Sequence, residues 1–415
     1  MKKICFLLLQ LSFFISEAQT NNIIDWINSN SIIIEDTSLN NDLIDFNKQV
    51  PQKFIDAQIY GFGEATHHSK DFFNIKTKFF KYLVEKQGVK TFMMEESYQA
   101  EKSVNEWISG GEGNRLTILE KFTLAPWHCN EIVDLLEWMR NYNQNKSKEE
   151  QIRFYGIDTQ IGENLNDEIK EFIKSHNITI DDELIKAIDG SVEKNRTDNP
   201  LIKLKEVERI IVEHQEEQNN DYTSVLRILN YLKNFTIYMQ NPKTEVRDEQ
   251  MFKNAVWIMD NIGQEEKVFI WAHNEHINKQ GHSVRITNLG NLLKEKYTDK
   301  YYSIGFDFGI GILPGVVIKK GKITGWEYFP LEKTYKNTFA ETLYKADSEV
   351  FFIDMELAVN TESSSFFSKE NRHLTLGASG FNPKKPVFIK RSYTDSYDGL
   401  IFVKKINPPT YKITE

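Results

Sequence analysis

Residues 58–67 read QIYGFGEATH, and this stretch with the thirty residues after it decides the fold. The apolar run over residues 58–63 is typical of a buried strand. Residues 71–86 carry apolar side chains at a helical period, Gly88 is a natural helix stop, and residues 90–94 are a second apolar run. Strand, helix and strand in this order indicate an α/β fold.

The same alternation continues along the chain. Further strands are expected at residues 152–157, 267–272, 301–306, 350–355 and 401–405, with a hairpin or pair of short strands over 315–326. Asn130 is expected to cap a helix. Residues from about 163 to 261 are polar and helix-rich, which indicates a helical insertion. We therefore expect an α/β protein with a largely parallel central sheet flanked by helices.

The first residues have the features of a secretory signal peptide. Lys2 and Lys3 precede a short apolar stretch over 4–15, and Ser16-Glu17-Ala18 offers a small-residue cleavage site. The prediction is a signal peptide over 1–18, a mature domain over 19–415, and export to the periplasm or the outside. The apolar stretch is too short to span a membrane, and Cys5 lies too early in it for a lipid anchor, so no stable membrane anchor is expected.

Charge and cysteine content narrow the classes of partner. The net charge is −9. Removing residues 1–18 takes away two positive charges and one negative charge, which leaves −10. This acidic balance argues against nucleic acid and anionic membranes as partners. Cys129 is the one cysteine of the mature chain, so no internal disulfide can form, and a buried structural thiol is favoured over a nucleophile.

Several catalytic motifs are missing. Residues 377–381 read GASGF, which lacks the final glycine of a nucleophile elbow. No H-E-x-x-H occurs, and residues 61–63 begin a dinucleotide turn that lacks its third glycine at Thr66. Serine hydrolases, zincin proteases and nucleotide enzymes therefore lose support, and no cofactor or bound metal is expected.

In a parallel sheet, the ligand lies beyond the carboxyl ends of the strands. The polar residues predicted at those ends are Glu64, His67, Glu95, Asp158, His273 and Asp307. His67 stands between a strand end and a helix start, where the helix favours the neutral imidazole. A neutral His67 can take a proton from water. The alternative is that His67 only fills a loop or caps the helix.

Partners for His67 are sought at the neighbouring strand ends. Glu95 either orients His67 or binds the water, unless it is only a solvated charge. His273 and His276 share a face only if the chain is helical there. One of them is a candidate donor to an oxyanion, and the alternative is a hydrogen-bonded core histidine.

Two other charged positions stand out. Lys76 lies on the apolar side of its helix, so it must snorkel outward or pair with an acid, and an inward Lys76 near Glu95 would belong to the site. Arg247 and Asp248 form an ion pair, hold the substrate, or by default are a solvated surface pair. The remaining histidines are expected to be structural: His68, His128, His176, His214, His282 and His373.

Eight segments together resemble the erythromycin esterase family. They are GEATH at 63–67 with DFF at 71–73, TFMME at 91–95, VNEWI at 104–108, WMRNYN at 138–143, FYGID at 154–158, RDEQM at 247–251, WAHNEH at 271–276 and YDGLI at 397–401. The resemblance spans nearly the whole mature chain. Known members of this family hydrolyse the lactone ring of macrolide antibiotics without a serine nucleophile, which links the family to antibiotic resistance.

Carried over residue by residue, the resemblance implies roles. His67 resembles the general base, Glu95 the carboxylate that works with it, and His273 a further active-site histidine. Glu64 matches the acid of the motif and is expected to orient the site, while Lys76 stands where the family often has arginine. Asp158, Arg247 and His276 are expected to support the site or hold the substrate.

The leading hypothesis is an exported hydrolase that cleaves a small-molecule carboxylic ester or a macrolide lactone with water activated by a histidine. One alternative is a metal-dependent hydrolase, peptidase-like or esterase, in which Glu64, His67, Glu95 and His273 bind Zn²⁺ or Mn²⁺. The other alternative is a non-catalytic protein that binds a ligand on the same scaffold.

Overall fold

The computed structural model describes residues 21–39, 41–193, 200–215, 220–263, 265–282, 286–359 and 364–411. The predicted signal peptide over 1–18, with Cys5, lies outside the described residues. The chain divides into two compact units. Unit 1 comprises residues 1–88, 272–280 and 297–410, and unit 2 comprises residues 89–271, 281–296 and 411–415.

Unit 1 is built on a mixed sheet with a parallel centre. Strand β2 (Ile59–Phe62) runs parallel to β6 (Tyr301–Lys319), and β6 runs parallel to β11 (Gly399–Ile406). Beyond β11, β8 (Val350–Asp354) and β1 (Ile32–Ile33) are added in antiparallel fashion. The order within unit 1 is therefore β1-β8-β11-β6-β2.

Helix α4 (Lys70–Gln87) follows β2 and covers this sheet. The Ser69 side chain accepts a hydrogen bond from the Phe72 N–H at its start, and Gly88 ends it at a φ of 70°, a conformation that costs glycine little. The helix buries Phe79, whose ring lies edge-on to Phe46, with centroids 4.8 Å apart. Residues 21–30 of unit 1 are also helical. The short helices of this unit include α2 (Ile44–Lys48), α3 (Gln52–Asp56), α13 (Asn274–Ile277), α15 (Phe339–Leu343), α16 (Met355–Val359), α17 (Ser364–Ser368) and α18 (Tyr393–Ser396).

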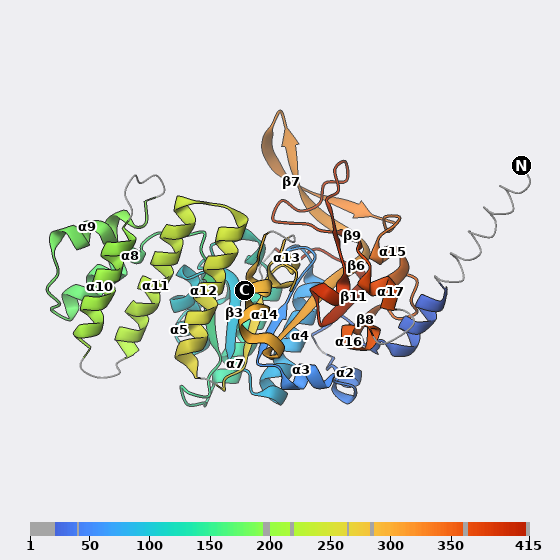
Figure 1. The fold of residues 1–415 in the computed structure, drawn as a ribbon, viewed down its shortest axis with the longest axis horizontal. Coiled ribbons are helices and arrows are strands. Elements are labelled where there is room, and N and C mark those ends of the chain that lie inside the picture. The colour runs from blue at the N-terminus through green and yellow to red at the C-terminus, as the bar shows by residue number, and fades with distance from the viewer. Residues whose placement is uncertain are drawn as a thin grey trace, which may run out of the picture. The chain divides into compact units, whose positions relative to one another are not determined.

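The second half of β6 extends beyond its pairing with β11 and forms an antiparallel hairpin with β7 (Lys322–Leu331). This hairpin projects from the rest of unit 1 (Figure 1). The strand predicted at 301–306 and the first half of the hairpin predicted at 315–326 are thus parts of one long strand. Strands β9 (Asn371–Leu374) and β10 (Phe388–Arg391) form a separate two-stranded sheet.

Unit 2 has a parallel sheet in the order β5-β3-β4. Strand β5 spans Val268–Trp271, β3 spans Thr91–Ser97, and β4 spans Arg153–Asp158. The side chain of Asn105 hydrogen-bonds both backbone groups of Phe154 at the outer edge of β4. It donates to the Phe154 carbonyl at 2.8 Å and accepts from the Phe154 N–H at 2.8 Å. Asn105 lies on α5 (Gln99–Ile108), which therefore closes an edge that would otherwise pair with another strand.

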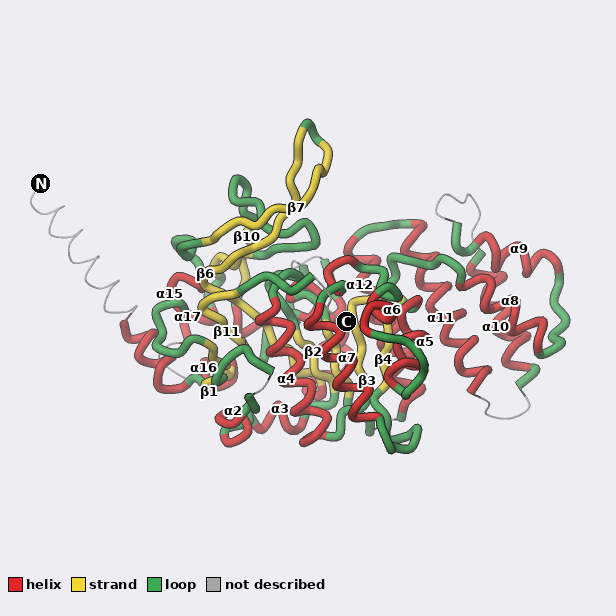
Figure 2. The backbone as a smooth tube through the Cα atoms, turned by 180° about the vertical axis from the view of Figure 1, so that it is seen from behind, coloured by secondary structure: helices red, strands yellow, loops and turns green. Residues whose placement is uncertain are grey.

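In the described part of the stretch predicted to be a helical insertion, unit 2 is helical (Figure 2). The helices there include α8 (Leu165–Ser175), α9 (Asp182–Gly190), α10 (Leu201–Glu213), α11 (Asn220–Gln240) and α12 (Thr244–Ile262). Buried apolar side chains of α8, α9, α10 and α11 form a core with Tyr98, which holds the N-terminal cap position of α5. Unit 2 also holds α6 (Arg115–Leu119), the 3₁₀ turn η1 (Ala125–Trp127), α7 (Asn130–Asn143) and most of α14 (Leu289–Tyr297), while η2 (Thr298–Lys300) belongs to unit 1.

The predicted α/β class with a mostly parallel sheet flanked by helices is confirmed, since the parallel pairings among the described residues include β2–β6, β6–β11, β3–β4 and β3–β5. The prediction that Asn130 caps a helix is wrong, because Asn130 is the first residue of α7 and Cys129 holds the cap position. Cys129 is buried, and burial raises the pKa of its thiol well above the ordinary value, as suits a structural thiol.

No helix among the described residues is both long enough and apolar enough to cross a membrane.

Candidate functional site

The turn after β2 brings Glu64 and His67 against α13 within unit 1. The Gly63 N–H donates to the Ile304 carbonyl at 2.9 Å, and the Asn274 N–H donates to the Glu64 carbonyl at 2.9 Å. A Cβ atom on Gly63 would lie 2.1 Å from Asn274 Oδ1, so only glycine permits this close approach. Asn274 in turn binds both the N–H and the carbonyl of Phe306 on β6.

Three charged or titratable side chains form a buried hydrogen-bonded chain at this turn. His67 Nδ1 lies 2.7 Å from Glu64 Oε1, and Lys76 Nζ lies 2.5 Å from Glu64 Oε2. The side chains of Glu64 and Lys76 are fully buried, while that of His67 is 10% exposed. Lys76 therefore points inward, and its acidic partner is Glu64.

These contacts assign the proton on the imidazole of His67. A carboxylate only accepts hydrogen bonds, so the bond to Glu64 places the proton of a neutral His67 on Nδ1. The lone pair then lies on Nε2, which is the atom that can take a proton from water. The Lys76 ammonium balances the Glu64 charge, so the buried group carries no net charge while His67 is neutral.

His273 lies beside His67, with ring centroids 4.8 Å apart. It stands at the N-terminal cap of α13, where its Nδ1 accepts a hydrogen bond from the Glu275 N–H at 3.2 Å. A neutral His273 therefore carries its proton on Nε2, which makes Nε2–H a donor suited to an oxyanion. The chain is helical directly after His273, which is the condition under which His273 and His276 can share a face. His276 is buried on α13.

Glu275 holds this helix to the C-terminal part of unit 1. Its Oε2 accepts a hydrogen bond from Arg391 Nη2 at 2.7 Å, and Arg391 Nη1 donates to the Tyr397 hydroxyl at 2.6 Å. Arg391 is buried, so this pair fixes α13, and with it His273, through charge-assisted bonds.

Three of the residues singled out in the sequence lie together within unit 2. Arg247 Nε and Nη2 bind the two oxygens of Asp158 at 2.9 and 2.7 Å, and Arg247 Nη2 also lies 2.7 Å from Glu95 Oε1. Burial alone would lower the pKa of Arg247, but Asp158 and Glu95 raise it well above its ordinary value. Glu95 is thus held by an arginine and is buried, so its interpretation as a solvated charge is wrong.

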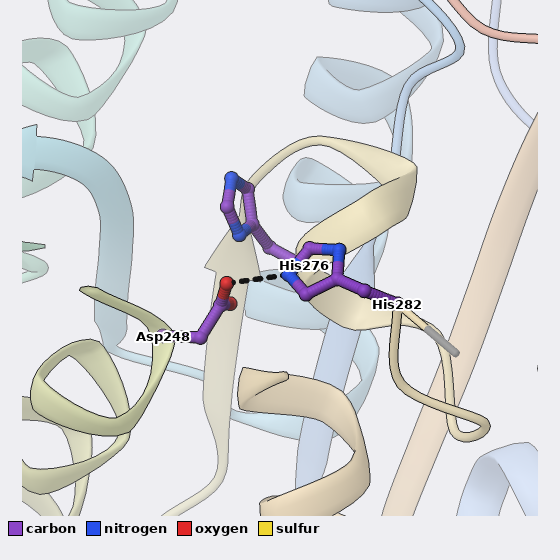
Figure 3. A group of neighbouring side chains, drawn as sticks. All are labelled: Asp248, His276 and His282. Atoms are coloured by element: carbon purple, nitrogen blue, oxygen red, sulfur yellow. Dashed lines mark hydrogen bonds and ion pairs between the residues drawn. The ribbon is translucent and has the colours of Figure 1, made fainter. Parts of the chain in front are cut away.

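The default interpretation of Arg247 and Asp248 as a solvated surface pair is also wrong. Asp248 is fully buried, and its Oδ2 lies 2.7 Å from His282 Nε2. Figure 3 shows these two side chains in contact. Its Oδ1 accepts a hydrogen bond from the Leu289 N–H at 3.1 Å. Asp248 therefore ties residues 281–296 to α12, and the helical pattern does not predict this because the two partners are far away in sequence.

A polar cluster in the C-terminal part of unit 1 is not predicted from the sequence. The Tyr393 hydroxyl donates to Asp307 Oδ2 at 2.5 Å and lies 3.0 Å from His373 Nδ1. All three side chains are buried. The sequence places Asp307 at a strand end and His373 among the structural histidines, but Tyr393 carries no motif that would indicate the pairing.

His68, the neighbour of His67, has a different environment. Its Nε2 lies 3.3 Å from the Ala378 carbonyl, and its ring packs edge-on against Trp326 of the hairpin. Burial, with a smaller contribution from the charge of His67, lowers the pKa of His68 from 6.5 to about 4. His68 is therefore uncharged at neutral pH.

Because the pKa of His68 is lower in the folded state, the unfolded chain binds more protons between pH 6.5 and 4. The stability that His68 contributes is present above about pH 6.5 and is lost as the pH falls toward 4. We expect this loss to reach about 3 kcal/mol at most. Urea unfolding of the wild type and of His68→Gln at pH 7 and about pH 4.5 should show the smaller drop in the variant, and equal drops would contradict the expectation.

The chain matches proteins of known family. The family model described as erythromycin esterase matches residues 84–406. Erythromycin esterase type II of Escherichia coli is 24% identical over 292 residues, which cover 60% of this chain and 68% of that protein. The putative hydrolase YbfO of Bacillus subtilis strain 168 is 20% identical over 440 residues, which cover 92% and 91%. A crystal structure of a Bacillus cereus protein has a TM-score of 0.81 at 23% identity, covers 95% of this chain and 99% of its own, and shows the fold alone.

Proposed function

The chain belongs to the erythromycin esterase family, and from this premise we propose that it cleaves a carboxylic ester or a lactone with water activated by His67. Membership of this family supports a hydrolase function. The observation that carries the proposal is the buried Glu64–His67 hydrogen bond, braced by Lys76. It supplies an oriented neutral base without a serine nucleophile.

The proposed reaction has two steps. His67 Nε2 removes a proton from water as the water oxygen attacks the carbonyl carbon, and the carbonyl oxygen becomes an oxyanion. The His273 Nε2–H donates a hydrogen bond to this oxyanion. The intermediate then collapses, the bond to the alkoxy oxygen breaks, and His67 returns its proton to that oxygen. The products are a carboxylic acid and an alcohol, or one hydroxy acid from a lactone.

Glu64 and Lys76 act through His67. When His67 becomes an imidazolium, the Glu64 carboxylate stabilises the charge, and it holds the ring in one orientation throughout. Lys76 limits the negative charge at Glu64 in the resting state. The roles predicted from the sequence for Glu95, Asp158, Arg247 and His276 remain proposals.

The hairpin of unit 1 supports a substrate with a bulky apolar body. Ile318, Ile323 and Trp326 of the hairpin are 59%, 65% and 49% exposed. The register pairs Ile318 with Ile323, and Trp326 contacts His68, the neighbour of the proposed base. Exposed apolar side chains gathered on one ribbon mark an interaction surface. A macrolide ring has this chemistry, and so do other large apolar esters.

An assay of the purified protein on p-nitrophenyl butyrate, a simple lactone and erythromycin tests the proposal. The proposal expects turnover of at least one of them, with the acid and alcohol, or the ring-opened hydroxy acid, identified by mass spectrometry. No turnover of any ester or lactone, together with stabilisation of the protein by one of these compounds, would contradict it and favour the ligand-binding alternative.

Metal-dependent hydrolysis is the other chemical alternative. In unit 1 both oxygens of Glu64 are engaged, one by His67 and one by Lys76, which favours an orienting role for this carboxylate over a role as metal ligand. Metal analysis of the active protein decides between the two. Stoichiometric metal, with activity lost in chelator and restored by Zn²⁺ or Mn²⁺, would overturn the metal-free mechanism.

We also propose that residues 1–18 direct export of the chain, on the strength of their basic, apolar and small-residue order. The protein recovered from its native host should then begin at Gln19. N-terminal sequencing of that protein checks this expectation, and a mature chain that still contains Lys2 and Lys3 would contradict it.

A further inference from the structure

Unit 2 contains a cavity of about 630 Å³ that is lined entirely by residues of that unit. Lys90, Thr91 and Arg153 line it where β3 and β4 begin. Glu95 and Asp158 lie at the opposite, carboxyl ends of these two strands. The cavity also reaches past the carboxyl end of β3 to Tyr98 and Glu101, but neither Glu95 nor Asp158 is among its lining residues.

The most buried charge of the cavity lining is Arg227 on α11, which is 3% exposed. Its Nη2 donates to Glu101 Oε2 at 3.1 Å and to the Gly156 carbonyl at 2.7 Å. Its Nε–H is buried and has no hydrogen-bond partner among the described residues. Because a buried donor without an acceptor is costly, this N–H marks a position at which a ligand acceptor is favourable.

Aromatic side chains surround this guanidinium. Its central carbon lies 5.4 Å from the ring centroid of Tyr98 and 5.7 Å from that of Trp257, and both residues line the cavity. Tyr155 of β4 adds a third ring to the lining. The cavity therefore combines a cationic donor with apolar rings, and its volume lies in the range of small-molecule sites.

The charge of the lining favours an anion. Four basic residues line the cavity, against three acidic ones. The basic residues are Lys90, Lys148, Arg153 and Arg227, and the acidic ones are Glu101, Glu149 and Glu266. Since the chain as a whole has a net charge of −9, a local excess of positive charge distinguishes this cavity from the average surface.

We propose that this cavity is a second ligand site, distinct from the proposed hydrolase site, and that it binds a small aromatic carboxylate. The ligand carboxylate accepts the Nε–H of Arg227, while its ring packs against Tyr98 and Trp257. Lys90 and Arg153 add to the attraction. Binding here is independent of His67, so it does not depend on the proposed reaction.

Isothermal titration of the full chain with benzoate tests the proposal, with benzyl alcohol as a neutral probe that has the same ring. Thr223 is an exposed residue of the lining on α11, and Thr223→Trp fills the cavity without changing the core. Thr244→Trp is the matched control, since Thr244 is exposed in the first turn of α12 and does not line the cavity. We expect the wild type to bind one benzoate per chain. The Kd should be at least about tenfold higher for benzyl alcohol with the wild type and for benzoate with Thr223→Trp. Thr244→Trp should bind benzoate with the wild-type Kd.

Two further variants show whether benzoate binds in the cavity or at the hydrolase site. Arg227→Lys keeps the charge but has no Nε–H, so it should also weaken benzoate binding, and if it fails to fold, Thr223→Trp alone decides. His67→Gln should bind benzoate as the wild type does. The proposal is overturned if the wild type shows no benzoate binding, if Thr223→Trp binds it equally well, or if His67→Gln abolishes binding, because benzoate would then occupy the hydrolase site.

Discussion

Replacing His67 with glutamine is expected to lower kcat/KM for ester hydrolysis by about 10²–10⁴-fold, the range that a general base contributes. Glutamine has no group that accepts a proton from water at neutral pH. Its amide can still donate to Glu64, so the Glu64–Lys76 pair keeps its surroundings and the free energy of unfolding should change little. Steady-state kinetics and urea unfolding of the same preparation give both quantities.

His128→Gln is the control for this experiment. His128 is a half-buried histidine of unit 2 whose Nε2 lies 2.9 Å from the Phe122 carbonyl, a contact that the glutamine amide can replace. We expect it to leave kcat/KM near the wild-type value. Equal activity of His67→Gln and the wild type would remove His67 from the mechanism.

Replacing Lys76 with methionine is expected to lower the free energy of unfolding by about 3–5 kcal/mol, the usual cost of removing one partner from a buried ion pair. Lys76 and Glu64 are both fully buried. Methionine therefore removes the cation that balances the Glu64 carboxylate and leaves that carboxylate hydrogen-bonded to His67. Urea unfolding measures the loss.

The same variant should change the pH dependence of the reaction. Without the Lys76 ammonium, the Glu64 carboxylate favours the imidazolium form of His67 more strongly, and the imidazolium cannot act as a base. The acid side of the kcat/KM profile should therefore move to higher pH. An unchanged profile in a folded Lys76→Met protein would show that Lys76 is only structural.

Lys78, two residues further along α4, provides the control. It is also buried, but its Nζ donates to the Asp36 carbonyl at 3.0 Å, and the Asp36 side chain is half exposed. Burial lowers the pKa of Lys78, so its charge is poorly compensated where it lies. Lys78→Met should cost clearly less than Lys76→Met and leave the pH profile unchanged. Glu64→Gln in addition to Lys76→Met should recover part of the lost stability, because no unpaired charge then remains buried.

The strands could be predicted where burial is local in sequence. Residues 58–63 and 90–94 are apolar runs, and β2 and β3 lie there. The direction of pairing could not be predicted, because it depends on distant partners: β8 is antiparallel to β11, and no feature of residues 350–355 indicates this. The length of β6 could not be predicted either, since its second half extends beyond β11 and pairs with β7.

The sequence positions of the candidate site residues could be predicted, but the contacts between their side chains could be predicted only in part. Glu64 and His67 follow β2, His273 follows β5, and within unit 1 His67 contacts both Glu64 and His273. The partner of Lys76 was not predictable, because which acid it meets depends on how α4 packs on the turn after β2. The contact between the Glu95 carboxylate and Arg247 in unit 2 was not predictable either, because Arg247 lies 152 residues further along the chain.

The central claim is that Glu64 holds His67 as a neutral base with its proton on Nδ1. NMR of the histidine-¹⁵N-labelled protein measures this directly, with the His67 ring assigned by comparison with His67→Gln. At the pH of maximal hydrolysis we predict ring signals of the tautomer with Nδ1 protonated and the lone pair on Nε2. Signals of the tautomer with Nε2 protonated, or of an imidazolium throughout the active pH range, would contradict the account.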